Sequence, residues 1–412
     1  MSKGNPNWLA SARSEAFGLF ESLDMPSPTE EVWRYVDLDF SLADFQLVTD
    51  AGPALLPEAE DRVVPRLEVV DGLATGPATN QPSGVSLLPL SEALRDDPSL
   101  ESRYDGIGVV VHDKFSAASR AFGSDGAHVR ISKGVLVPDP VFVDIQAVTN
   151  LAVSFPRVVI EVEAGAEASV VVEFRSEDSL AALVVPEFDV VVGENANFRL
   201  TIVQRWGSGT TAIARVRVVA ARDAQITLAE AGLGGALARM HLAVDLEGRG
   251  SSANIIGAFF GDRDQVLDYR YFMRHIGENT NSDMFLKGAV EDEALSIFTG
   301  LIRLEESAQR TNAFQTNRNL LLSEDAAAQS VPNLEILAND VKCGHASTVG
   351  PLDEDQRYYL MSRGLDQKRA DRLQVRGFFE DVLSRFPEQS VAGPVRDRIN
   401  AKYIAAQEEG RV

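Results

Sequence analysis

Hydrophobic residues near the N-terminus recur at the spacing of one face of an α-helix. The pattern runs from Leu9 to Leu23. Pro26 and Pro28 then interrupt it, because proline lacks an amide hydrogen and its ring clashes with the preceding helical turn. The stretch that follows is acidic, contains several prolines and shows weak periodicity. We therefore expect residues 1–100 to form a small domain with one amphipathic helix and irregular parts.

Between residues 101 and 350 the pattern changes to alternating valine-rich runs, which are typical of half-buried β-strands. Val158, Ile160 and Val162 form one such run. Small residues also open strands at nearly equal steps of about 28 residues, and apolar residues follow two positions later in the same register. The small residues are Ala168, Ala196, Ala224, Ala253 and Thr280.

A repeating unit of this length, with two short strands and two turns, cannot bury its apolar face alone, so successive units must stack. The sequence therefore predicts a mainly β fold with a β-solenoid core over residues 101–350. A β-sandwich or barrel is the alternative, since it also has short strands and regular turns. Neither fold is expected to place its apolar residues at the same spacing in one repeat after another.

Residues 351–412 return to helical patterns. Asp353 and Asp366 are suited to cap two helices, because an aspartate side chain accepts hydrogen bonds from the free amides of the first turn. Gly364 lies where the first helix should end, in the position where glycine often adopts a left-handed conformation. A third helix is expected over residues 395–407. The chain should thus end in a helical domain.

Charge and composition exclude several classes of function. The 412 residues contain 39 basic and 61 acidic residues, a net charge of −22, and this field repels nucleic-acid backbones and acidic lipid surfaces. We therefore expect no nucleic-acid and no membrane partner. The single cysteine, Cys343, permits no intrachain disulfide, which fits a reducing compartment. With no apolar run long enough to span a bilayer, the sequence predicts a cytoplasmic protein.

Local enzyme signatures are missing from the sequence. It contains no Walker A motif, so we expect no bound nucleotide and no ATP hydrolysis by this chain. It also contains no H-E-x-x-H, G-x-S-x-G or C-x-x-C motif. A carbohydrate-active β-helix enzyme remains an alternative, since such enzymes use clustered carboxylates, and Asp262, Asp264 and Asp268 lie close together in sequence.

Cys343 and His345 form the one pair of soft-metal ligands in neighbouring positions. In an extended strand, residues two apart point to the same face, so a thiolate and an imidazole can approach one metal together. The alternative is a buried thiol beside a histidine in a turn. Two ligands fall short of the four that zinc or an iron–sulfur unit generally takes, so a partner chain would supply the others.

Several segments around this pair resemble the SufD family of the SUF iron–sulfur cluster assembly system. They lie densely between Asn317 and Gly364, and the Trp33-Arg34-Tyr35 segment resembles the N-terminal region of the same family. The resemblance implies an N-terminal helical region, a right-handed parallel β-helix core and a C-terminal helical domain. The matching segments are Asn317 to Ser323, Pro332 to Ile336, Asp340 to His345, Thr348 to Gly350 and Tyr358 to Gly364.

What the resemblance implies about function is a non-catalytic scaffold subunit. It would pair with the paralogue SufB through the β-helix cores and bind the ATPase SufC through the C-terminal helices. A transient iron–sulfur cluster would form at the SufB interface, with His345 matching the family histidine there and Cys343 the neighbouring cysteine. The family usually reads Cys-Ser-His-Gly-Ala-Thr, whereas this chain reads Cys-Gly-His-Ala-Ser-Thr. Both candidate ligands are kept, and the change affects the flexibility of the loop beside them.

A SufB-like subunit is the alternative within the same system. SufB-like chains carry further cysteines, including one that accepts sulfur, whereas residues 315–319 here contain none. The sequence does not decide whether the chain forms a homodimer when SufB is absent. The resemblance also points to Tyr359, Arg363, Gly364 and Phe378 as the surface that docks a SufC-like ATPase, although these residues would serve equally well in packing the helical domain.

Overall fold

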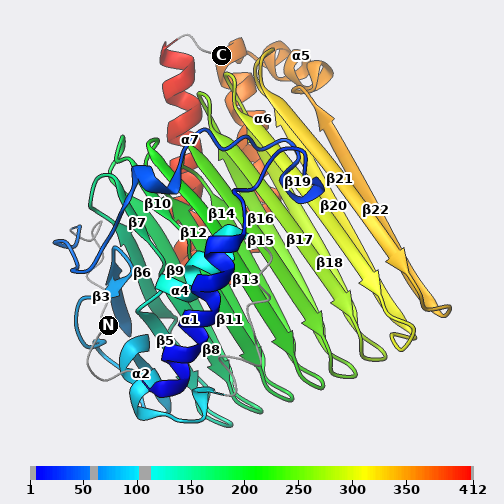
Figure 1. Ribbon diagram of the computed structural model, residues 1–412. Coiled ribbons are helices and arrows are strands. Elements are labelled where there is room, and N and C mark those ends of the chain that lie inside the picture. Colours follow the sequence, from blue (N-terminus) through cyan, green and yellow to red (C-terminus); the bar gives the residue numbers. More distant parts are fainter. Residues whose placement is uncertain (1–5, 56–63, 102–112, 410–412) are drawn as a thin grey trace.

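The computed structural model describes residues 6–55, 64–101 and 113–409. Its core is a β-solenoid in which the chain passes alternately through two sheets (Figure 1). The first sheet, sheet A, has 12 strands: β1 Gln46–Leu47, β4 Val85–Pro89, β5 Gly126–Ile131, β7 Ala152–Ser154, β8 Arg157–Val162, β10 Ala182–Val184, β11 Glu187–Val192, β13 Thr210–Ala220, β15 Leu237–Leu246, β17 Val266–His275, β19 Leu295–Leu304 and β21 Ala327–Ile336.

The second sheet, sheet B, has 10 strands and faces the first across the core. From β6 onward each strand pairs in parallel with the strand of the same sheet in the next coil. The strands of sheet B are β2 Arg66–Val70, β3 Leu73–Ala74, β6 Val141–Ala147, β9 Glu167–Ser176, β12 Asn197–Arg205, β14 Gln225–Gly232, β16 Ser252–Gly261, β18 Asn281–Val290, β20 Thr311–Leu321 and β22 Val341–Gly350.

Strand alternation builds the core. In β12, Phe198, Leu200 and Ile202 point inward and are fully buried among the other inward-facing side chains of both sheets. Successive side chains of a strand point to opposite faces, so Val203 points outward instead and packs beneath the C-terminal helices. The prediction of a mainly β chain with a solenoid core is confirmed, and the parallel ladders exclude the sandwich and barrel alternatives.

The predicted register of the repeat is wrong at three of its four steps. The coils are not of equal length, and each of the three errors is a shift of two positions. Such a shift keeps every side chain on its original face, so the hydrophobic pattern does not reveal it. In the ladders Ala168 pairs with Phe198, and Ala253 pairs with Ile226 and Ser282, where the repeat predicted Ala196, Ala224 and Thr280.

The turns that lead from sheet A to sheet B share a residue in the left-handed conformation. Glycine, asparagine and aspartate tolerate this region best, and the turns use them in all but one coil. The N–H group of each such residue donates a hydrogen bond to a carbonyl of the next coil, which ties neighbouring turns together. The residues are Gly165, Asn195, Asp223, Gly250, Asn279 and Arg310, with φ between 54° and 75°.

The N-terminal end of the solenoid finishes with antiparallel strands. Sheet A finishes with β4 and sheet B with β3, and both strands run antiparallel to their neighbours. Helix α2, Leu90–Asp96, packs beside β4 and β5. The predicted N-terminal region, residues 1–100, thus supplies strands to both sheets, so the solenoid begins within it.

N-terminal helices and loops cover the outer face of sheet A. Helix α1, Asn7–Ser22, confirms the predicted N-terminal helix, and it packs on α4, Lys114–Phe122. Two short 3-10 helices, Glu31–Trp33 and Leu42–Asp44, lie in the segment that follows α1. Trp33 is buried there.

Trp33 is the anchor of this N-terminal segment. It packs against Phe115 of α4, and the Arg239 guanidinium lies 3.9 Å from the centre of its ring. Arg239 is itself buried on β15 and forms an ion pair with Asp268 of β17. A cation over an indole ring is attracted by the ring's electrons. These contacts hold the segment against sheet A.

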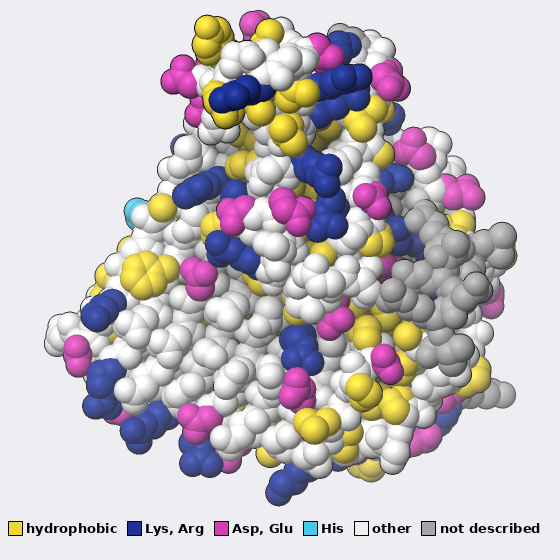
Figure 2. All heavy atoms as spheres, turned by 180° about the vertical axis from the view of Figure 1, so that it is seen from behind, with side chains coloured by type: hydrophobic (Ala, Val, Ile, Leu, Met, Phe, Trp, Pro, Cys, Tyr) yellow, Lys and Arg dark blue, Asp and Glu magenta, His cyan; other side chains and the backbone are white. Residues whose placement is uncertain are grey.

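The C-terminal helices cover the outer face of sheet B. Figure 2 shows this side of the molecule, turned by 180° from the view of Figure 1. The helices are α5 Glu354–Ser362, α6 Gln367–Leu383 and α7 Gln389–Glu409. The side chains of Asp353 and Asp366 cap α5 and α6, as predicted. Gly364 has a φ of +95° and ends α5, also as predicted. Helix α7 begins six residues before the predicted start of the third helix and continues through Pro394.

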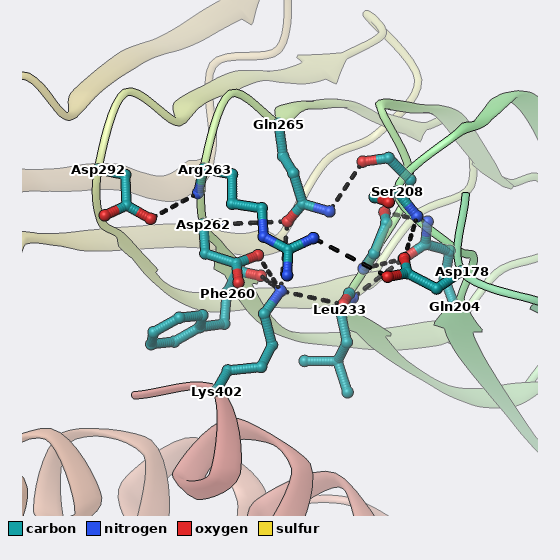
Figure 3. A network of polar contacts seen from close by, with 12 residues as sticks. Asp178, Gln204, Ser208, Leu233, Phe260, Asp262, Arg263, Gln265, Asp292 and Lys402 are labelled. Atoms are coloured by element: carbon teal, nitrogen blue, oxygen red, sulfur yellow. Dashed lines mark hydrogen bonds and ion pairs between the residues drawn. The ribbon is translucent and has the colours of Figure 1, made fainter. Parts of the chain in front are cut away.

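Lys402 fixes α7 to the solenoid wall (Figure 3). Its ammonium lies 2.7 Å from an Asp262 carboxylate oxygen and donates hydrogen bonds to the carbonyls of Leu233 and Phe260 and to the Gln265 amide oxygen. These partners lie on or beside the turns of two successive coils. Burial lowers the pKa of Lys402, although the Asp262 charge opposes that shift. One side chain thus joins the helical domain to both coils.

Candidate functional site

The last strand of sheet B, β22, carries both predicted cluster ligands. Cys343 is the register partner of Ala313, and it packs against the hydrophobic core. His345 is the register partner of Gln315 and is exposed. Because they lie two positions apart in a strand, the two side chains leave the same face. The structure therefore brings Cys343 and His345 to the inner side of the final coil.

That final coil is the open end of the solenoid. Strand β21 ends sheet A and β22 ends sheet B, and within the described ranges no strand pairs with the outer edge of either. An unpaired edge presents a row of free N–H and C=O groups that another strand can pair with. Both candidate ligands thus lie on a strand that is available to a second chain.

Inward-facing residues become polar as the coils approach this end. The column that contains Leu200, Leu228, Ile255 and Met284 continues with Gln315 and then His345. Gln315, Asn317 and Asn319 are all inward on β20, with exposed fractions of 1%, 1% and 3%. We call these three residues the amide layer.

Hydrogen bonds connect the amide layer to the final coil. Asn317 Oδ1 accepts from Asn319 Nδ2 at 2.6 Å and from the Ser330 hydroxyl at 2.8 Å. The Ser347 hydroxyl donates to Ser330 at 2.8 Å. Sequence reasoning did not assign these residues to the site, although the alternation of Gln315, Asn317 and Asn319 was the available signal. Polar residues at inward positions mark the end of the apolar core.

The surroundings of the Cys343 thiol disfavour its ionised form. Burial raises its pKa, so the thiol form dominates at neutral pH, whereas the thiolate is the form that attacks electrophiles and binds metals. A metal bound beside it would favour the thiolate.

The described residues do not form a complete metal site. In residues 6–55, 64–101 and 113–409, no group of three or more His, Cys, Asp or Glu side chains is arranged to hold a metal ion. Cys343 and His345 offer two ligands of the types that soft metals prefer. An iron–sulfur unit held here would need ligands from outside this part of the chain.

The acidic residues considered for a carbohydrate-active enzyme do not converge on a groove. Asp268 is fully buried in its ion pair with Arg239, and Asp262 is buried against Lys402. Asp264 is exposed on a turn. Two of the three carboxylates are thus occupied by structural ion pairs.

The predicted docking residues gather on the C-terminal helices. Tyr359 and Phe378 both line a pocket of about 450 Å³ between α5, α6 and the end of β20. The Arg363 guanidinium lies 5.2 Å from the centre of the Tyr359 ring. Gly364 follows directly in the turn to α6. All four residues are therefore close to one surface.

Helix α5 presents large apolar side chains to solvent. None of its residues is buried, and the exposed fractions are 77% for Tyr358, 55% for Tyr359 and 42% for Met361. A helix this exposed contributes little to the core of its own chain. Its exposed aromatic residues have the character of a binding surface, because aromatic side chains are enriched at the centres of protein interfaces.

Comparison with known proteins identifies the family of this chain. The family description "SUF system FeS cluster assembly, SufBD core domain" matches residues 144–378, which is more than half of the chain. The chain belongs to the SufBD family. The match begins in β6, contains both candidate ligands and ends in α6, so the family's core domain includes the solenoid coils from β6 onward, their open end and α5.

Individual members of the SufBD family are similar over nearly the whole chain. The iron–sulfur cluster assembly protein SufD of Bacillus subtilis is 29% identical over 94% of this chain and 92% of its own length. SufD of Escherichia coli is 27% identical over 92% and 89%. A SufBD family protein of Mycobacterium tuberculosis is 28% identical over 95% and 92%. No helix in the described part of this SufBD family chain has the length and apolar character needed to cross a membrane.

Proposed function

We propose that this SufBD family chain is a non-catalytic scaffold subunit of the SUF system that holds a nascent iron–sulfur cluster together with a SufB-like paralogue. The observation that carries the proposal is the position of Cys343 and His345 on β22, an edge strand at the open end of both sheets. A cluster bound there is the cargo of assembly. The paralogue supplies the remaining ligands, since a cluster generally takes four.

The partner joins at the edges of β21 and β22. Strand addition to an open sheet edge gives main-chain hydrogen bonds and would cover the polar final coil. The amide layer supports this proposal, because an inward surface with Gln315 and Asn317 suits a polar junction better than an apolar one. The relatives named SufD favour the SufD role for this chain over the SufB-like alternative.

A SufC-like ATPase docks on the surface that contains Tyr359 and Phe378. The chain itself binds and hydrolyses no nucleotide, in keeping with a sequence that lacks a Walker A motif. The complex works in the cytoplasm, where a single cysteine stays reduced. The helical domain lies on sheet B, so rigid-body motion of the ATPase can reach the solenoid through α6 and α7.

Co-expression tests the whole proposal. The chain is purified anaerobically with SufB-like and SufC-like subunits, and the complex is characterised by native mass spectrometry and by iron and sulfide analysis. We expect a stable complex of the three proteins that carries iron and sulfide. A chain that purifies without either subunit, or a complex that retains no iron after reconstitution, would refute it.

A further inference from the structure

A second groove lies on the C-terminal helices, between α6 and α7. Arg369, Arg372 and Arg376 of α6 line one side, and Asn400 and Tyr403 of α7 line the other. The groove has a volume of about 270 Å³. Spacings of three and four residues place the three arginines on one face of α6. None of the described residues that line this groove carries a carboxylate.

The charge of the helical domain differs from that of the remaining chain. Residues 351–412 contain eleven basic and eleven acidic residues, so the net charge of −22 lies entirely in residues 1–350. Within the helical domain other arginines are matched to carboxylates of the same domain: Arg357 contacts Asp371 at 2.6 Å, and Arg396 contacts Glu380 at 2.7 Å.

The three arginines of the groove have fewer carboxylate partners than these other arginines. Arg376 forms no ion pair with any residue that the structure describes. Arg369 reaches only Asp366, at 3.4 Å, and both side chains are largely exposed. Arg372 donates to the Gln407 amide oxygen rather than to a carboxylate. Three guanidinium groups thus face one groove with a single weak carboxylate partner.

Leu373 joins this groove to the aromatic pocket. It lines both the arginine groove and the pocket of Tyr359 and Phe378, and it is 47% exposed. The two hollows therefore form one continuous surface across α6. Figure 2 shows lysine and arginine side chains next to hydrophobic ones over the C-terminal helices.

We propose that the arginine groove binds an acidic segment of the docking ATPase subunit, so that partner choice depends on carboxylates as well as on the apolar pocket. This inference rests on the proposed function and specifies the chemistry of its docking surface. Arginine suits the task, because its planar fork pairs with a carboxylate through two parallel hydrogen bonds. Charges of this kind act mainly on the rate of association and on the choice of partner.

The test compares ATPase binding at two salt concentrations. The variant R369Q/R376Q leaves Arg372 and its contact with Gln407 intact. We expect its affinity for a purified SufC-like subunit to fall about tenfold in 50 mM salt and less than threefold in 500 mM salt, because salt screens exposed charges. The matched control is R398Q, since Arg398 is exposed on α7 but two residues from Asn400 and so on another face of the helix. We expect it to change affinity less than twofold.

The outcomes separate this inference from the proposed function. Absence of wild-type binding would overturn both. Wild-type binding with an unchanged affinity and salt dependence in R369Q/R376Q would overturn the arginine groove and leave the docking intact. A groove that binds 10 mM inorganic phosphate, measured by calorimetry, while the double variant still binds the ATPase normally would identify a small-anion site and also refute the acidic segment.

Discussion

His345 lies directly above Gln315 in the strand stack: the two are register partners on β22 and β20. Gln315 is 1% exposed, whereas His345 is exposed on the final coil. The imidazole therefore stands on a buried amide at the point where the apolar column ends. Its position is fixed by the strand ladder while its ring remains accessible to a partner chain.

Replacing His345 should reduce cluster content without unfolding the chain. We expect His345→Ala to lower the iron and sulfide content of the reconstituted complex by about fivefold or more, because one of few available ligands is removed. The unfolding midpoint should stay unchanged, since the side chain is exposed. Lys342→Ala, at an exposed position of β22 three residues before His345, is the control and should retain full cluster content. Equal iron content in the two variants would contradict the ligand role.

The Cys343 thiol should react slowly in the folded chain. Burial raises its pKa, so the thiolate fraction at pH 8 is smaller than in an exposed cysteine. We expect alkylation by iodoacetamide at pH 8 to be at least fivefold slower in the native chain than in the same chain in guanidinium chloride, measured by mass spectrometry. A native rate equal to or above the unfolded rate would show an activated thiol instead.

Adjacent tyrosines should differ in their effect on ATPase docking. Tyr359 lines the pocket with Phe378, whereas Tyr358 is more exposed and does not line it. We expect Tyr359→Ala to weaken binding of the SufC-like subunit tenfold or more, as for an aromatic residue central to an interface. Tyr358→Ala should weaken it less than threefold. Calorimetric titration measures both, and equal losses would place the binding surface elsewhere.

Stability should fall between pH 6.5 and 8.5 because of Glu230. This residue is buried inside the solenoid with the Tyr271 hydroxyl as its hydrogen-bond partner, and burial raises its pKa to about 8. The folded chain keeps a proton that the unfolded chain has lost, so the stabilisation is complete at low pH and disappears as the pH passes 8. The expected loss is about 2 kcal/mol over this interval.

Glu230→Gln tests this pH dependence by urea unfolding. The variant removes the titrating group and keeps a similar shape, so most of the decline should disappear. A smaller decline should persist from Glu187, whose pKa burial raises to about 7. Above pH 6.5 the buried His275, with a pKa of about 4, adds no slope. An unchanged decline in the variant would show that another group is responsible.

Lys402 should matter more for stability than Arg396 on the same helix. Lys402→Ala leaves the Asp262 carboxylate buried without its cation, which costs about 3–5 kcal/mol in comparable buried pairs. Arg396→Ala removes a more exposed pair with Glu380 and should cost about 1 kcal/mol or less. Urea unfolding measures both changes. Comparable losses would mean that the contacts of Lys402 do not hold α7 in place.

Local rules anticipated much of this structure. Helix α1, the caps at Asp353 and Asp366 and the glycine end of α5 depend on nearby residues alone, so a single sequence contains the needed information. The solenoid also followed from its pattern, because alternation with a long repeat requires stacked coils. The close sequence positions of Cys343 and His345 were sufficient to place them together on one strand.

Other features depend on contacts between distant segments. The unequal coil lengths at Ala168 and Ala253 were missed because an error of two positions leaves the inward face unchanged. The amide layer was missed because Gln315 and Asn317 alternate with their neighbours as solvent-facing residues do. Only the coil above them makes these positions buried. The groove of α6 likewise forms only because α7 packs beside it, and no local sequence pattern predicts the packing of these two helices.

The two ends of the solenoid differ in strand direction, which bears on how chains could stack. The N-terminal end finishes with the antiparallel strands β3 and β4, whereas β21 and β22 at the other end pair in parallel with their inner neighbours. A parallel solenoid open at both ends would add units head to tail without limit, as heterologous contacts do. A head-to-tail copy would meet β21 and β22 with strands of the opposite direction, so the parallel ladder would not repeat from chain to chain. Two such free ends that met each other would instead form a closed pair.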